Sequence, residues 1–239
     1  MMLRNSWFTL VRFGFRLLYN EMAWTYGAVS WGVSLGQWRQ WQLAALPFVQ
    51  GRRVLELGHG PGHMLLALQN RRFDVVGLDL SAAMGRQARR RTQRTVPLVR
   101  GMVQDLPFAT AVFDTILATF PTDYIIDPLT LAAAHRVLRA HGCLVIVPEG
   151  HLNGQGHIVR FIDWLFTITG QRQGAFAVDD GHIWPADALW EPMRQRFAAA
   201  GFALTIERIQ LPRSGVTVLV AEKEQTRQVF EDLSGLNGI

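Results

Sequence analysis

The stretch VLELGHGPGHMLLAL, residues 54–68, carries glycine at every second position of its centre, between an apolar run typical of a strand and one typical of a helix. Glycine has no Cβ atom, so Gly58 and Gly60 can adopt positive φ and let a ligand approach the backbone closely. Gly62 lets a helix begin directly against the strand. We therefore predict a buried strand at residues 54–57, followed by a ligand-binding loop and a helix.

Strand-like and helix-like segments alternate through the next hundred residues. The further predicted strands lie at 74–79, 97–102, 113–120 and 143–149, and the predicted helices at 62–69, 81–94 and 128–142. Ser81 is expected to cap the second of these helices, because its hydroxyl can accept from a free amide of the first turn. This alternation predicts a parallel sheet with right-handed crossovers and helices on both faces.

The end of the chain follows a different pattern. A helix predicted over 186–200 precedes two strands, 202–211 and 215–223, joined only through PRSG. That connection is too short for a crossover helix, so the two strands are expected to be antiparallel neighbours. The fold class is therefore α/β: a doubly wound, Rossmann-like sheet of seven strands with a reversed C-terminal hairpin.

A chain of 239 residues, 49% of them hydrophobic, is long enough for one large α/β domain. We expect a single domain, 1–239, with four parts. These are an N-terminal helical cap (1–50), a cofactor-binding core (51–150), an inserted substrate cap with a helix after the fifth strand (151–185), and a C-terminal helix and hairpin (186–225).

The chain is basic, with 24 Lys and Arg against 19 Asp and Glu and a sequence pI of about 10.3. Such a charge permits anionic partners, such as a phospholipid surface or nucleic acid, without requiring them. Cys143 is the only cysteine, which excludes an internal disulfide and a cysteine metal cluster and fits a reducing cytoplasm. We expect a cytoplasmic protein.

The first twenty residues are apolar but interrupted by arginines, so they match neither a spanning helix nor a signal peptide. Two interpretations stay open: a helix that packs over its own active site, or one that rests at a membrane interface. The stripe on which both depend consists of Phe8, Val11, Phe15 and Leu18, beside Arg12 and Arg16.

The glycine loop does not fit the common phosphate-binding patterns. A dinucleotide fingerprint requires glycine three positions after Gly60, where this chain has His63. A phosphate loop requires Lys followed by Ser or Thr, and none closes this loop. The remaining candidate is a cofactor with a nucleoside and a zwitterionic tail but no phosphate.

Several motifs in order resemble those of the class I S-adenosylmethionine-dependent methyltransferases. They are VLELGHGPGH, VVGLDLS, LPF with FDTILATF, and HRVLRAHGCLVIV, which together span about residues 50–150. The segment YGAVSWGVSLGQWRQW resembles the helix before the glycine motif in the ubiquinone/menaquinone and phospholipid N-methyltransferase branch. The resemblance implies S-adenosylmethionine as cofactor and S-adenosylhomocysteine as product.

The resemblance also implies a set of binding residues. Glu56 would orient the ammonium of the methionine tail, Asp79 would accept from the ribose hydroxyls, and Met102 stands where the family has an acidic residue, so backbone groups would replace its contact to the adenine. The full set is Tyr26, closing over the methionine carboxylate; Glu56, Gly58, His59, Gly60 and Gly62 in the loop; Asp79; Leu80 and Met84, bracketing the adenine; Met102 and Val103; and Thr119 and Phe120, beside the sulfonium.

Two members of this set have an alternative role. Met84 fits core packing nearly as well as adenine binding, and His59 either touches the substrate or faces solvent. The catalytic residue stays unassigned, since methyl transfer to a neutral amine needs no base whereas a phenol, enol or ring carbon benefits from one. Residues near the expected mouth that can serve as a base are Asp123, Glu149, His151 and His157. No histidine spacing predicts a metal site.

Aromatic residues before the glycine motif and in the predicted substrate cap favour a small, lipophilic acceptor such as a lipid head group or a quinone-like ring. Core packing would produce the same composition. Two other functions stay open. The run GRQARRRTQR permits a nucleic-acid methyltransferase, although no aromatic-basic platform accompanies it, and the altered position Met102 permits a non-catalytic S-adenosylmethionine-binding protein.

Overall fold

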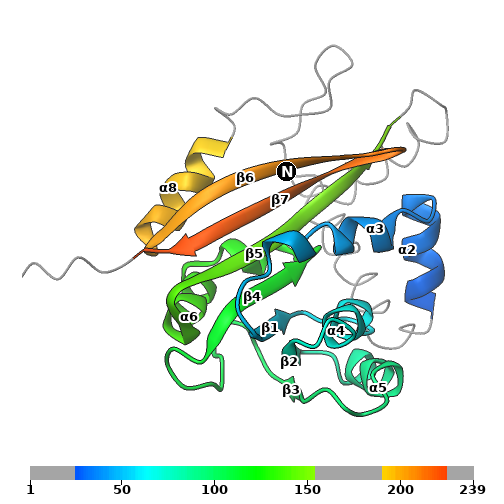
Figure 1. Cartoon of the computed structure of the whole chain (residues 1–239), viewed down its shortest axis with the longest axis horizontal. Coiled ribbons are helices and arrows are strands. Elements are labelled where there is room, and N and C mark those ends of the chain that lie inside the picture. The colour runs from blue at the N-terminus through cyan, green and yellow to red at the C-terminus, as the bar shows by residue number, and fades with distance from the viewer. Residues whose placement is uncertain (1–24, 154–189, 225–239) are drawn as a thin grey trace, which may run out of the picture.

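The structure is a computed structural model that describes residues 25–153 and 190–224 (Figure 1). Its centre is a seven-stranded sheet with the order β3-β2-β1-β4-β5-β7-β6. The strands are β1 (Arg53–Leu57), β2 (Asp74–Asp79), β3 (Leu98–Arg100), β4 (Phe113–Thr119), β5 (Leu138–Leu152), β6 (Phe202–Leu211) and β7 (Ser214–Lys223). Strands β1 to β5 pair in parallel, while β7 runs antiparallel to both β5 and β6. The predicted doubly wound sheet with a reversed C-terminal hairpin is confirmed.

Helices cover both faces of the sheet. They are α2 (Tyr26–Ser34), α3 (Trp38–Leu43), α4 (His63–Gln69), α5 (Ala82–Arg91), α6 (Pro128–Val137) and α8 (Glu191–Ala199), with 3-10 turns η2 (Leu46–Phe48) and η3 (Asp123–Ile126). Leu131 of α6 and Phe197 of α8 belong to the apolar core on one face. Trp41, Met64 and Ala88, from α3, α4 and α5, belong to the core on the other. Burial on both faces explains why the central strands are apolar without alternation.

Capping residues set the start of two helices. The hydroxyl of Ser81 accepts from the amide of Met84 at 3.2 Å, which confirms the predicted cap of α5. The carboxylate of Asp127 accepts from the amide of Leu129 at 2.9 Å, with Pro128 in the first turn. Proline suits this position because the first amides of a helix have no partner within it.

One predicted boundary is wrong. The periodic run from 128 to 142 predicts a helix up to the glycine, but α6 ends at Val137 and β5 begins at Leu138. Leu138 pairs with Phe113 of β4, and His141 takes a left-handed conformation with φ 61° before the main run of β5. Pairing with a distant strand therefore outweighs the local helical pattern at this point.

Some expectations fall outside the described residues. They concern the apolar stripe within 1–24, most of the inserted cap at 151–185, and His157. Among the helices that the structure does describe, none has both the length and the apolar character needed to cross a bilayer.

Gly62 is expected to be far more sensitive to alanine than another glycine of the same layer. Its φ is 82°, and an added Cβ would lie 2.8 Å from the Cβ of Ala88. Gly62→Ala should therefore lower the free energy of unfolding by about 2 to 4 kcal/mol. Gly85→Ala, inside α5 with open space around it, should raise stability by up to about 1 kcal/mol. Urea unfolding measures both changes. Equal effects would contradict the conclusion that, of these two glycines, only Gly62 lacks space for a Cβ atom.

Candidate active site

The glycine loop follows β1 at the point where strand order reverses, with β2 on one side and β4 on the other. In a doubly wound sheet, ligands bind at this crevice. Gly58 and Gly60 have φ of 62° and 51°, as the sequence predicts. A Cβ on Gly58 would lie 2.7 Å from the hydroxyl of Tyr124, whereas one on Gly60 would meet nothing within 4 Å. The loop is therefore enclosed at Gly58 and open at Gly60.

Asp79, the last residue of β2, holds this loop in place. Its Oδ2 accepts from the amide of Gly60 at 2.9 Å, and its Oδ1 accepts from the amide of Ser81 at 2.7 Å. The amide of Gly58 donates to the carbonyl of Leu78 at 2.7 Å. A carboxylate has about four acceptor sites, so Asp79 keeps capacity for further donors on its open side.

Glu56 is buried beneath the loop, with 1% of its surface exposed. Its Oε2 has no hydrogen-bond partner within the part of the chain that the structure describes. Burial raises the pKa of this carboxyl well above its usual range, and the nearby charge of Asp79 raises it further, while a hydrogen bond from the Leu65 amide opposes the shift. An acid in this position is stabilised in its charged form when a cation binds beside it.

Apolar side chains flank the loop at its outer edge. Leu80 and Met102 are 61% and 56% exposed, unusual values for large hydrophobic residues. The amide of Gly101 donates to the carbonyl of Asp79 at 3.3 Å, which keeps the two segments adjacent. Val103 is buried in the core. The exposed pair provides apolar surface next to the carboxylate at the end of β2.

His59 and Met84, both predicted to adjoin the ligand, are buried. Met84 is fully buried, so the core-packing alternative describes it. His59 is only 4% exposed, so it does not face solvent, and its Nδ1 lies 2.7 Å from the carbonyl of Gly60. Gly77 leaves the space that this ring fills, since a Cβ there would lie 2.9 Å from the imidazole. Burial lowers the pKa of His59, which favours a neutral ring.

Helix α3 contacts the end of β4, where Thr119 and Phe120 are predicted to adjoin the reacting sulfur. Gln42 donates to the hydroxyl of Thr119 at 3.1 Å. The ring of Phe120 stacks on Trp38, with centroids 3.9 Å apart. Phe120 has φ 52°, a strained conformation for this residue type, and its amide donates to the carbonyl of Val147 at 2.7 Å. Trp38 and Gln42 were missed by the sequence prediction, although their spacing of four places them on one face of α3.

The remaining predicted residues lie on α2, η3 and β5. Tyr26 begins α2, but its side chain lies outside the described part of the chain. Asp123 is exposed on η3, while Glu149 and His151 lie on β5, the latter buried. Within the described ranges, no group of three or more potential ligands could hold a metal ion.

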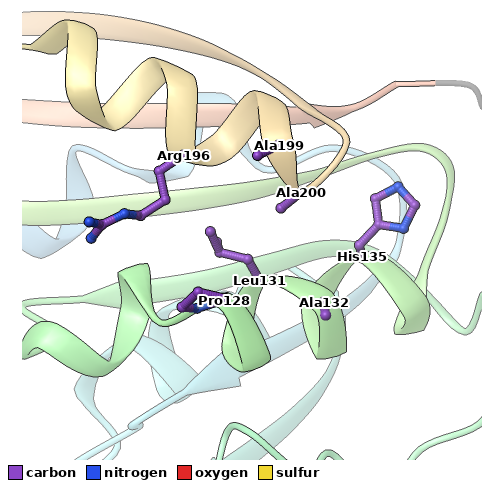
Figure 2. Close-up of a pocket in the computed structure, with 7 residues that line it drawn as sticks. All are labelled: Pro128, Leu131, Ala132, His135, Arg196, Ala199 and Ala200. Carbon is purple, nitrogen blue, oxygen red and sulfur yellow. The ribbon is translucent and has the colours of Figure 1, made fainter.

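A separate cavity of about 400 Å³ lies between α6 and α8, on the face of the sheet opposite α3, α4 and α5 (Figure 2). Figure 2 shows Arg196 and His135 near its two ends, with Leu131 between the helices. It is lined by Pro128, Leu131, Ala132, His135, Arg196, Ala199 and Ala200. None of these residues belongs to the glycine loop, so the cavity is not part of the candidate site.

Comparison with known proteins agrees with the geometry of the loop. Residues 54–142 match a family described as a methyltransferase domain. This match covers β1 to the start of β5, including every loop of the candidate site between the glycines and Phe120.

The curated relatives that match this chain are named as different methyltransferases. A malonyl-[acyl-carrier protein] O-methyltransferase of Legionella pneumophila is 38% identical over 104 residues, 41% of this chain and 37% of that protein. A demethylmenaquinone methyltransferase of Renibacterium salmoninarum is 30% identical over 138 residues, 56% of this chain and 58% of that protein. The chain thus spans less than two thirds of the length of either relative.

Solved structures share the fold of the methyltransferase domain. The YcgJ protein of Bacillus subtilis has a TM-score of 0.54 and 16% identity, over 78% of this chain and 99% of that chain. Phosphoethanolamine N-methyltransferase 2 of Haemonchus contortus, solved with phosphomonomethylethanolamine and S-adenosylhomocysteine, also has a TM-score of 0.54 and 16% identity, over 80% of this chain and 53% of that chain. The fold is therefore the Rossmann-like fold of class I methyltransferases.

Replacement of Glu56 is expected to change how stability depends on pH. The pKa of Glu56 is raised in the folded protein, so its favourable contribution is complete below about pH 4, the unfolded value, and is lost as the pH rises through the folded value. Glu56→Gln removes this dependence. Urea unfolding should show the variant gaining stability relative to wild type as the pH rises from about 4.5 to about 8. A difference that does not change with pH would contradict the burial of an uncompensated acid.

Proposed function

We propose that this chain transfers a methyl group from S-adenosylmethionine to a small, lipophilic acceptor. The observation that carries the proposal is the carboxylate of Asp79, which lies at the end of β2 and is hydrogen-bonded to Gly60 of a bare glycine loop. A carboxylate in this position can accept from both hydroxyls of a ribose. The methyltransferase domain match over 54–142 supports the same function.

The residues present fit the donor from end to end. The open side of Gly60 leaves space for a ligand beside the backbone. The buried Oε2 of Glu56, which has no partner among the described residues, suits the ammonium of the methionine tail. The exposed apolar surfaces of Leu80 and Met102 suit the faces of an adenine ring. No phosphate is needed to satisfy any group of the site.

The donor, when bound, supplies an activated methyl group on a positively charged sulfur. The chain's own contribution is to hold the reacting groups in line, which can lower the barrier by up to about 7 to 11 kcal/mol in favourable systems. Thr119 ends β4 and Phe120 follows it, and Gln42 and Trp38 of α3 contact these two residues. No residue is assigned as a general base.

Trp38, Gln42 and Phe120 form a wall next to the loop. Its aromatic side chains support a lipophilic acceptor with a planar group. The ring of Phe120 stacks on Trp38, and Trp41 lies 6.2 Å from Phe120, centroid to centroid. Trp41 is fully buried, so a further ring would stack or tilt against Trp38 and Phe120. One relative is named a demethylmenaquinone methyltransferase, which supports a quinone-like acceptor.

The donor site is tested by calorimetry with S-adenosylhomocysteine. Asp79→Asn keeps the shape of the side chain but removes its charge, so each lost charged hydrogen bond should weaken binding about 10- to 100-fold. Asp105→Asn, at an exposed position of the neighbouring loop, is the matched control and should bind as wild type does. Absence of heat with the wild-type protein, or equal affinity of the two variants, would contradict the proposal.

The acceptor site is tested by following methyl transfer to a naphthoquinol, a phosphoethanolamine lipid and a short RNA. We expect transfer to one of the lipophilic acceptors and none to RNA. Trp38→Ala removes one aromatic contact surface, so it should raise the KM for that acceptor about 10-fold and change donor affinity less than that. Leu129→Ala, exposed on α6, is the control. Transfer to RNA alone, or donor binding without transfer to any acceptor, would overturn the acceptor assignment.

A further inference from the structure

Helix α2 has an unusual distribution of polarity. Its polar residues face inward: Ser30 and Ser34 are buried, and their hydroxyls donate to the carbonyls of Gly27 and Ser30 of the same helix, at 3.1 and 2.6 Å. Its outward positions are apolar. The exposed residues of α2 and its C-terminal cap, which we call the α2 face, are Gly27, Ala28, Val29, Trp31, Gly32 and Leu35. This is the reverse of a helix that faces water.

Trp31 dominates the α2 face. It is 66% exposed, the largest exposed fraction among the large hydrophobic residues that the structure describes. Gly36 lies against the indole, because a Cβ there would be 3.1 Å from Nε1. Around it the face is open, since Cβ atoms on Gly27 and Gly32 would meet nothing within 4 Å. An open apolar face with an exposed indole resembles the aromatic residues that anchor proteins at membrane interfaces.

Exposed arginines lie on α3, which contacts α2, and on α5. Helices α2, α3, α4 and α5 contact one another in succession, and α2, α4 and α5 occupy one side of the molecule in Figure 1. Arginines 39, 86, 89 and 90 on α3 and α5 are exposed, and none of them forms an ion pair with a described residue. Arg39 and Arg91 both act on His63 of α4, whose pKa is lowered to about 4 by burial and then by these two charges. Arg39 of α3 and Arg91 of α5 therefore both lie near His63.

We propose that the α2 face, together with the exposed arginines of α3 and α5, binds the surface of an anionic phospholipid bilayer. Such a surface has the two properties that the patch requires, an apolar layer for Trp31 and Leu35 and negative charge for the arginines. A protein partner would need directional hydrogen bonds as well. The α2 face offers no side-chain donor or acceptor among its described residues except the indole nitrogen of Trp31.

The position of this surface relates it to the acceptor. Helix α3 follows α2 directly and contributes Trp38 and Gln42 to the wall beside Phe120. A lipophilic acceptor dissolved in the bilayer would then reach the site next to the contact; this step rests on the proposed function. Binding to the bilayer itself does not, because it involves neither the glycine loop nor Asp79.

A fluorescent label at the α2 face reports contact directly. Gly32→Cys places a thiol in open space, and Cys143 is buried, so a polarity-sensitive maleimide dye labels position 32 selectively. Vesicles of phosphatidylcholine in which about a quarter of the lipid is phosphatidylglycerol should shift the emission of the dye to the blue. Leu129→Cys, 64% exposed on α6, is the matched control and should not shift. No shift at 32, or an equal shift at 129, would overturn the proposal.

Vesicle sedimentation of the full chain, without methyl donor, separates the two parts of the patch. Trp31→Ser should weaken binding about 10-fold, and each of Arg86→Gln and Arg89→Gln about 5-fold at low salt, whereas Leu129→Ser should have no effect. An emission shift at position 32 that follows protein concentration without vesicles would indicate a second copy on this face and overturn the proposal. Calorimetry with S-adenosylhomocysteine on the same variants reports separately on the donor site.

Discussion

The hydrogen bond from the Gly60 amide to the Asp79 carboxylate joins the two parallel strands on which the site depends. It fixes the loop after β1 against the end of β2, while the second oxygen of Asp79 accepts from Ser81 at the start of α5. Three elements thus meet at one carboxylate. Glycine at positions 58 and 60 takes the positive φ of this closure without the strain that another residue would carry.

The carboxyl group of Glu56 lacks a partner that would satisfy its charge among the described residues. The acid is fully buried beneath the loop, and one of its oxygens lacks a partner within the described residues. Ionisation of Glu56 therefore destabilises the folded protein when no ligand is bound. A bound cation would offset this cost, so the same residue that weakens the free protein favours a positively charged ligand. Burial of the Glu56 carboxyl is thus the cause both of the lower stability and of the preference for a cation.

The sequence predicts the sheet, the reversed hairpin and the glycine loop because each depends on local patterns: apolar runs, turn residues and short connections. It does not predict the start of β5 at Leu138, which depends on pairing with Phe113. The burial of Met84 and His59 and the contact of Gln42 with Thr119, 77 residues away, depend on packing between distant segments in the same way. The loop was therefore predictable from spacing, whereas the wall beside Phe120 required the fold.

The two ends of the donor belong to two strands in our proposal: its tail lies at the loop after β1 and its sugar at the end of β2. A crystal structure with S-adenosylhomocysteine tests this most directly. We predict both ribose hydroxyls within hydrogen-bond distance of Asp79 and the ammonium above Glu56, with the sulfur facing Phe120. A nucleoside bound elsewhere, with Asp79 bonded only to Gly60 and Ser81, would contradict the account.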